Sequence, residues 1–201
     1  INWTIALHML LSGITMYYLL KHYVTGRFGA TIAGIVYTYS APHIMHIYPG
    51  HPNLLATTAW MPLAFLFLDR LIRREGVKYG FWLSIIIALE LLAGYPQHLL
   101  YILLALSFYL LFSLTWLRSD GCGWKEIGSK GLAFAVFIAL GLALSAVQIL
   151  PTVEMTKYST RENLSYEWVS IFSFPPENLI TFLIPDFFGD MLKIPYWAKN
   201  Y

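Results

Sequence analysis

The chain has 201 residues, of which 58% are hydrophobic, 17% aromatic and 12% charged, and its formal net charge is +2. Soluble domains carry about 25% charged residues, so this composition predicts an integral membrane protein. The small net charge, with basic residues between apolar segments rather than along one stripe, excludes nucleic acid as an expected partner. Cys122 is the only cysteine, which excludes an internal disulfide and a cysteine-based zinc site.

Six apolar segments follow one another along the chain, and we expect each to be a membrane-spanning helix. Their expected ranges are 1–20, 28–40, 54–72, 77–94, 99–117 and 131–150. The second would be only about 20 Å long, so it should pack against other helices or bend. Pro62 predicts a kink in the third, and Pro151 predicts the end of the sixth. The sequence therefore predicts an all-α polytopic bundle of about six transmembrane helices over residues 1–151, opening inside an apolar segment as a fragment of a larger domain.

The fourth and fifth segments form one apolar run of 37 residues, from Phe81 to Leu117. An unbroken helix of that length would measure about 55 Å, nearly twice the hydrocarbon thickness of a bilayer. Pro96 disfavours helix at Tyr95, and Gly94 can adopt a left-handed cap. We therefore expect a tight hairpin at Gly94, which brings Gln97 and His98 to one membrane face.

The distribution of Lys and Arg predicts the orientation. Nine of these residues fall in alternate loops on one side and four on the other: Lys21, Arg27, Arg70, Arg73, Arg74, Lys78, Arg118, Lys125 and Lys130 against Lys157, Arg161, Lys193 and Lys199. Because basic loops stay inside, the loops at 21–27, 70–80 and 118–130 should be cytoplasmic. Residues 42–53, the hairpin and the chain after Pro151 would then lie outside.

Residues 152–201 differ in character and are expected to form an outer-face loop. The stretch 152–174 mixes polar and aromatic residues, with Trp168, Ile171 and Phe172 at helical spacing, which is typical of an amphipathic segment on a membrane surface. A short apolar helix is predicted over 179–184, opened by Pro176 and Glu177.

Histidines cluster between the second and third segments, at His43, His46 and His51. Three imidazoles can form a metal site or donate to a phosphate. Equally, the three histidines can lie at the membrane–water interface without binding a ligand. No fourth ligand is indicated, so no metal or other cofactor is predicted.

Glu90 lies in the apolar run 85–92. A carboxylate there costs several kcal/mol unless it faces a partner or a cavity, which makes it a candidate functional residue. It lies one turn from Gly94, however, so it can also extend toward the interface or be protonated.

The sixth segment ends in further polar residues. Gln148 should bond inside the bundle, since an unmet amide in lipid is costly. Lys157 and Arg161 are four apart, so in a helix they would form a cationic edge suited to a phosphate. The alternative is that they contact lipid head groups or pair with Glu154 and Glu162.

Five short motifs, in this order, carry a resemblance to a known family. They are Ala59-Trp60-Met61-Pro62-Leu63, Ala93-Gly94-Tyr95-Pro96-Gln97, Ser145-Ala146-x-Gln148-x-x-Pro151-x-x-Glu154, Phe174-Pro175-Pro176-Glu177 and Pro185-x-Phe187-Phe188-Gly189. Together they resemble the bacterial YfhO-type membrane proteins, through nearly the whole chain. That family is similar to the GT-C glycosyltransferases.

The resemblance implies an enzyme of the bacterial plasma membrane that moves a sugar from a polyprenyl-phosphate carrier to a cell-envelope polymer on the outer face. It places the general base on a first outer loop that would precede Ile1, so no catalytic residue is assigned. We expect His51, Lys157 and Arg161 to hold the lipid phosphate, and Gln97, His98, Gln148 and Glu154 to shape the sugar pocket. A transporter or flippase of an amphiphilic substrate, with Glu90 near its path, is the alternative. A non-catalytic scaffold of envelope assembly is the third.

Overall fold

The fold is described by a computed structural model of the chain. It describes residues 2–23, 26–73, 76–159, 165–166, 170, 173–189 and 197. The contacts between Cα atoms divide the chain into two compact units, residues 1–149 and 150–201, and each unit is described by itself.

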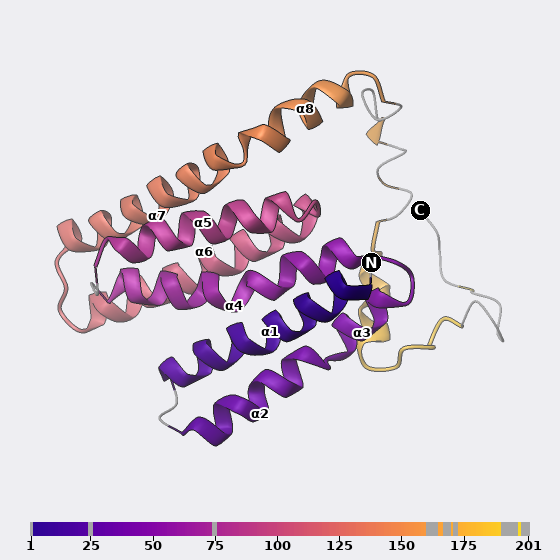
Figure 1. Cartoon of the computed structure of the whole chain (residues 1–201), viewed down its shortest axis with the longest axis horizontal. Coiled ribbons are helices and arrows are strands. Elements are labelled where there is room, and N and C mark those ends of the chain that lie inside the picture. Colours follow the sequence, from indigo (N-terminus) through magenta and orange to yellow (C-terminus); the bar gives the residue numbers. More distant parts are fainter. Residues whose placement is uncertain are drawn as a thin grey trace. The chain divides into compact units, whose positions relative to one another are not determined.

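The described part of the chain is helical and contains no strand, as the sequence predicts. The first unit holds α1 (Asn2–Tyr23), α2 (Arg27–Thr38), α3 (Ala41–Ile47), α4 (Pro52–Ile72), α5 (Lys78–Leu92), α6 (Pro96–Ser119) and α7 (Trp124–Leu144) (Figure 1). Helix α8 (Ala146–Thr156) leads into the second unit, which also holds the 3-10 helix η1 (Pro176–Phe182).

Four of the described helices, α1, α4, α6 and α7, are long and apolar enough to cross a membrane. Helices α2 and α5 also form where two further spans are predicted, but they hold only 12 and 15 residues. At 1.5 Å per residue they are about 18 and 22 Å long, shorter than the roughly 30 Å of hydrocarbon. The count of six spans therefore stays a prediction.

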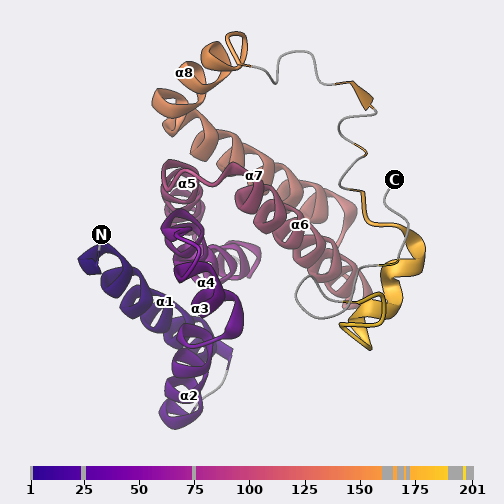
Figure 2. The ribbon, with the colours of Figure 1, turned by 90° about the vertical axis from the view of Figure 1, so that its right-hand side faces the viewer.

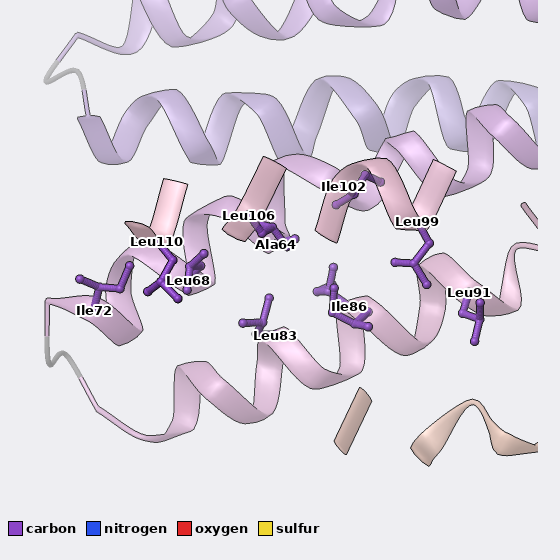
Figure 3. Packing of buried hydrophobic residues seen from close by; sticks show 11 residues of the cluster. Ala64, Leu68, Ile72, Leu83, Ile86, Leu91, Leu99, Ile102, Leu106 and Leu110 are labelled. Carbon is purple, nitrogen blue, oxygen red and sulfur yellow. The ribbon is translucent and has the colours of Figure 1, made fainter. Parts of the chain in front are cut away.

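Helix α4 is the centre of the first unit. It packs against α1 on one side and against α5 and α6 on the other, while α7 packs on α5 and α2 packs on α1 (Figure 2). The buried cluster comes from α4, α5 and α6 and consists of Ala64, Leu68, Ile72, Leu83, Ile86, Ile87, Leu91, Leu99, Ile102, Leu106 and Leu110 (Figure 3). Its members recur at helical spacing along each of the three helices, so each helix contributes one face to this cluster.

Small residues bring two helix pairs close together. A Cβ on Gly34 of α2 would lie 2.7 Å from the carbonyl oxygen of Gly13 in α1. A Cβ on Gly141 of α7 would lie 2.8 Å from the carbonyl oxygen of Ser84 in α5, whose hydroxyl donates to the Phe137 carbonyl at 2.7 Å. Close approach of this kind is typical of helix packing in membranes, where dispersion and interhelical hydrogen bonds hold the helices together.

The predicted break at Gly94 is confirmed. Helix α5 ends at Leu92, Gly94 has a φ of +86°, and α6 begins at Pro96. The left-handed glycine ends one helix, and the proline starts the next. In the first turn of a helix the backbone N–H makes no intrahelical hydrogen bond, so proline costs none there.

The prediction that Pro151 ends the sixth helix is wrong. Helix α7 runs only to Leu144, and α8 then continues through Pro151 to Thr156. The interruption falls at Ser145, where the backbone N–H groups of Ser145 and Gln148 bond three residues back, to the Leu142 and Ser145 carbonyls at 3.1 and 2.9 Å. Proline removes only one backbone hydrogen bond and can lie inside a helix.

Three loops are also shorter than predicted. Helix α6 ends at Ser119 and α7 begins at Trp124, so the loop expected over 118–130 is reduced to residues 120–123. Lys130, counted there as a loop charge, is 8% exposed and its ammonium donates to the Ile72 carbonyl. The other two connections, expected over 21–27 and 70–80, run between Tyr23 and Arg27 and between Ile72 and Lys78.

The second unit contains the predicted short helix near residue 180, though as a 3-10 helix that begins three residues earlier. Pro176 and Glu177 lie in its first turn, as expected. Phe188 is 7% exposed, and its ring lies against Phe187 and Trp197. Trp168, Ile171 and Phe172, on which the predicted amphipathic segment depends, lie outside the described residues.

Candidate functional site at the hairpin end of the bundle

Polar side chains of the first unit gather at both ends of the bundle, with the apolar cluster between them. One end carries the turn at Gly94, and we call it the hairpin end. The other carries Asp69, near the end of α4, and we call it the Asp69 end. Most of the predicted site residues of the first unit lie at or near the hairpin end.

Two side-chain amides face the backbone of the hairpin. A Cβ on Gly94 would lie 3.3 Å from the Asn53 amide nitrogen and 3.9 Å from the Gln148 amide nitrogen. The structure thus places Gln148 beside the hairpin and adds Asn53, which the sequence analysis did not single out. The one signal for Asn53 is its polar side chain in the first turn of α4, directly before the apolar residues Leu54 and Leu55.

Gln97 and His98 begin α6 beside two tyrosines. The Gln97 amide donates to the Tyr101 hydroxyl at 2.6 Å. The half-buried His98 ring lies 5.3 Å from the Tyr95 ring and 5.7 Å from the Tyr101 ring, measured between centroids. The aromatic rings fix the imidazole, and Gln97 stays exposed at the end of the bundle.

His46 links the histidines of two separate segments. Its ring lies 6.3 Å from that of His51, at the start of α4. Its Nδ1 lies 2.5 Å from the Pro42 carbonyl, so Nδ1 carries the proton and Nε2 is left as an acceptor. His51, at the start of α4, and His46 are exposed and accessible to a ligand.

His43 belongs to the packed interior instead. It is 3% exposed, its Nε2 lies 3.1 Å from the Thr58 hydroxyl, and its ring meets the Tyr37 ring edge-on at 4.8 Å. Burial lowers the pKa of His43 because it disfavours the charged imidazolium. His43 and His46, three residues apart, therefore face different surroundings.

Glu90 lies one turn below the hairpin and is fully buried, with 0% exposure. Among the residues that the structure describes, neither of its carboxyl oxygens has a hydrogen-bond partner. The Thr57 hydroxyl reaches only the Glu90 backbone carbonyl, at 3.3 Å. A buried carboxyl without a partner is costly, so Glu90 stands out among the buried polar groups of the first unit.

The remaining predicted site residues do not belong to the first unit. Glu154 lies on α8 and Lys157 directly follows it, both exposed, and both lie in the second unit. Arg161 lies outside the described residues.

The chemistry of the hairpin end is that of neutral donors and acceptors. It presents amides, imidazoles and phenols, a set that suits the hydroxyls of a sugar or, after protonation of the imidazoles, the oxygens of a phosphate. Among the described residues, no three His, Cys, Asp or Glu side chains are grouped so that they could hold a metal ion.

A second polar cluster, at the Asp69 end, was missed by the sequence analysis. The Asp69 carboxylate, 3% exposed, accepts hydrogen bonds from Tyr109 at 2.5 Å and Arg73 at 2.7 Å, and lies 2.6 Å from Nε2 of His22. Asp69 also raises the pKa of Arg73 above its usual value. The Tyr23 and Tyr109 hydroxyls are 2.9 Å apart. The cluster ties α1, α4 and α6 together, and its members are too far apart in sequence to reveal it.

A hollow of about 700 Å³ lies between α1 and α2 of the first unit. Its walls are mostly apolar and include Met9, Ile14 and Ile35, with no acid and no imidazole. An apolar hollow of this kind suits the acyl chain of a lipid rather than a catalytic site.

Comparison with known proteins identifies the family. No curated protein and no solved structure matches the chain. A family model described as "Bacterial membrane protein YfhO" matches residues 1–199. A match over nearly the whole chain confirms the resemblance carried by the five motifs. The chain belongs to the YfhO family of bacterial membrane proteins.

Proposed function

We propose that the chain is part of a membrane enzyme of the GT-C type that transfers a sugar from a polyprenyl-phosphate carrier to a cell-envelope acceptor. The reaction would take place at the hairpin end, on the outer face of the bacterial plasma membrane. The observation that carries the proposal is the pair of amides, Asn53 and Gln148, that converges on Gly94 beside Gln97 and His98. Side-chain amides accept and donate at once, which is what recognition of a sugar hydroxyl requires.

The residues have separate roles in this proposal. Asn53, Gln97, His98 and Gln148 bind the sugar, and His51 contacts the phosphate of the carrier. The sequence-based hypothesis that Glu154 binds the sugar and that Lys157 and Arg161 bind the phosphate is tested by substitution, since the departing phosphate needs donors or cations to stabilise its charge. The general base, a carboxylate that accepts the proton of the attacking hydroxyl, is not assigned to any residue.

The experiment is sugar transfer by the full-length protein in membrane vesicles, measured with a labelled polyprenyl-phosphate sugar. Asn53→Ala and Gln148→Ala should each lower transfer about tenfold or more, because each removes a hydrogen bond to the substrate. Arg161→Ala should weaken donor binding. Ser107→Ala is the matched control, because the Ser107 hydroxyl bonds only within α6, to the Leu103 carbonyl at 2.7 Å.

Transport of an amphiphilic substrate is the second candidate, and Glu90 favours it. A buried, unpartnered carboxyl inside a bundle is a feature of proton-coupled and ion-coupled carriers. The two functions differ in their product: a transferase leaves the sugar covalently attached to the acceptor, whereas a carrier delivers it unchanged. Translocation of unmodified substrate, lost in Glu90→Gln and kept in Gln148→Ala, would replace the enzyme proposal.

A further inference from the structure

The Asp69 end contains a cavity that the proposed function does not use. It measures about 440 Å³, within the roughly 300–1,000 Å³ of small-ligand sites. The end of α4 and the C-terminal half of α6 form its walls. Its polar and aromatic lining includes Asp69, Arg73, Tyr109, Phe112, Trp116 and Asp120.

The cavity presents one cation and one anion that are free to bind. Arg73 uses its Nε to donate to Asp69, and its side chain is 59% exposed. Its two terminal nitrogens have no partner among the described residues, so they are available to an oxyanion. The exposed Asp120 carboxylate also has no partner within the described part of the chain.

The buried Asp69 cannot itself serve as the second binding carboxylate. Tyr109 already occupies one of its oxygens, and His22 and Arg73 approach the other. Its role is to hold the Arg73 guanidinium in place through the hydrogen bond to Nε, which leaves the edge formed by the two terminal nitrogens available to a ligand. A fixed guanidinium binds an anion at a lower cost in side-chain entropy than a free one.

The aromatic residues of the cavity show where it lies in a membrane. Phe112 and Trp116 are 66% and 64% exposed, and both lie in the last two turns of a helix long enough to span the bilayer. Exposed tryptophan at the end of a span is typical of the head-group region. The ligand therefore approaches from the lipid, with a charged head at Arg73 and Asp120 and chains along α6.

We propose that this cavity binds the head group of a zwitterionic phospholipid, with its phosphate on Arg73 and its ammonium on Asp120. The indole of Trp116 lines the same cavity and can add a cation–π contact to the ammonium. The site is independent of sugar transfer, since none of its residues takes part in the proposed reaction.

The test is competition between phosphatidylethanolamine and phosphatidylglycerol for the full-length protein, measured by native mass spectrometry. Asp120→Asn should lower the ratio of bound phosphatidylethanolamine to phosphatidylglycerol about threefold, the size of one exposed ion pair. Arg73→Gln should lower the binding of both lipids. Lys125→Gln, an exposed charge of α7 outside the cavity, should leave the ratio unchanged.

Two results would overturn the proposal. The first is an unchanged lipid ratio in Asp120→Asn, since the carboxylate would then not contact the ammonium. The second is a fall in the ratio with Lys125→Gln as large as that with Asp120→Asn, which would mean a general effect of surface charge. Asp120 is exposed, so its substitution should leave the unfolding temperature in detergent unchanged and the comparison valid.

Discussion

Two buried carboxyl groups in the first unit have opposite surroundings. Asp69 is surrounded by donors from three helices, whereas Glu90 has none among the described residues. A satisfied buried carboxylate stabilises the fold that contains it, and an unsatisfied one destabilises it. The two residues should therefore respond differently to removal of the charge.

Replacing Glu90 with methionine should stabilise the protein. Methionine has a similar volume and no polar atom to desolvate, so the free energy of unfolding should rise by about 1–2 kcal/mol. Leu89→Met, next to it on α5, is the control for the flexibility of methionine. Unfolding in mixed micelles of increasing SDS content measures the change, and a destabilised Glu90→Met would reveal a partner for the carboxyl.

Replacing Asp69 with alanine should destabilise the protein by about 3 kcal/mol. The loss arises because His22 and Tyr109 keep their buried polar atoms after the shared acceptor is gone. Tyr23→Phe removes only the exposed hydrogen bond to Tyr109 and should cost less than about 1 kcal/mol. Equal effects of the two substitutions in the same SDS titration would show that Asp69 does not anchor the network.

At the scale of the helix, the apolar segments and the Gly and Pro residues that interrupt them predicted most of the observed helices. The turn at Gly94 and Pro96 was predictable because both residues restrict the backbone locally. The end of α7 was not, because Pro151 lies inside α8 instead of ending a helix, and the interruption falls earlier, at Ser145. The Asp69 cluster joins residues 22, 69 and 109, and nothing in the sequence indicates which polar residues meet across a bundle.

The packing of α7 on α5 should depend on one glycine. In Gly141→Ala the new Cβ would lie 2.8 Å from the Ser84 carbonyl oxygen, so the helices must separate, which costs about 1–3 kcal/mol. Gly131→Ala, two turns or more earlier in α7, meets no atom within 4 Å and should be neutral or stabilising by up to about 1 kcal/mol. The difference in unfolding temperature between the two variants measures the effect of the close contact between α5 and α7. A neutral Gly141→Ala would place α5 and α7 farther apart.

For the molecule as a whole, the arrangement of α4, α5 and α6 predicts that the short helix α5 crosses the membrane. The first unit places the connections before α5 and after α6 at the same end of the bundle, since Ile72 and Leu110 lie together at one end of the buried cluster and Leu91 and Leu99 at the other (Figure 3). With α4 and α6 spanning, this arrangement requires α5 to cross as well. Its 15 residues can do so because α4 and α7 cover it on two sides.

Thiol labelling should therefore find Gly76 and Cys122 on one side and Gly50 on the other. Cys122 is the only cysteine of these 201 residues, so Gly76→Cys and Gly50→Cys are made in a full-length background in which Cys122 and any other cysteine are replaced by serine. The excess of basic residues around Gly76 and Cys122 predicts that both are cytoplasmic. A membrane-impermeant maleimide should then label Gly50→Cys in intact cells, and the other two positions only in inverted vesicles. Labelling of Gly76→Cys and Cys122 from opposite sides would mean that α5 returns without crossing, and the hairpin end would then not reach the outer face where sugar transfer is proposed.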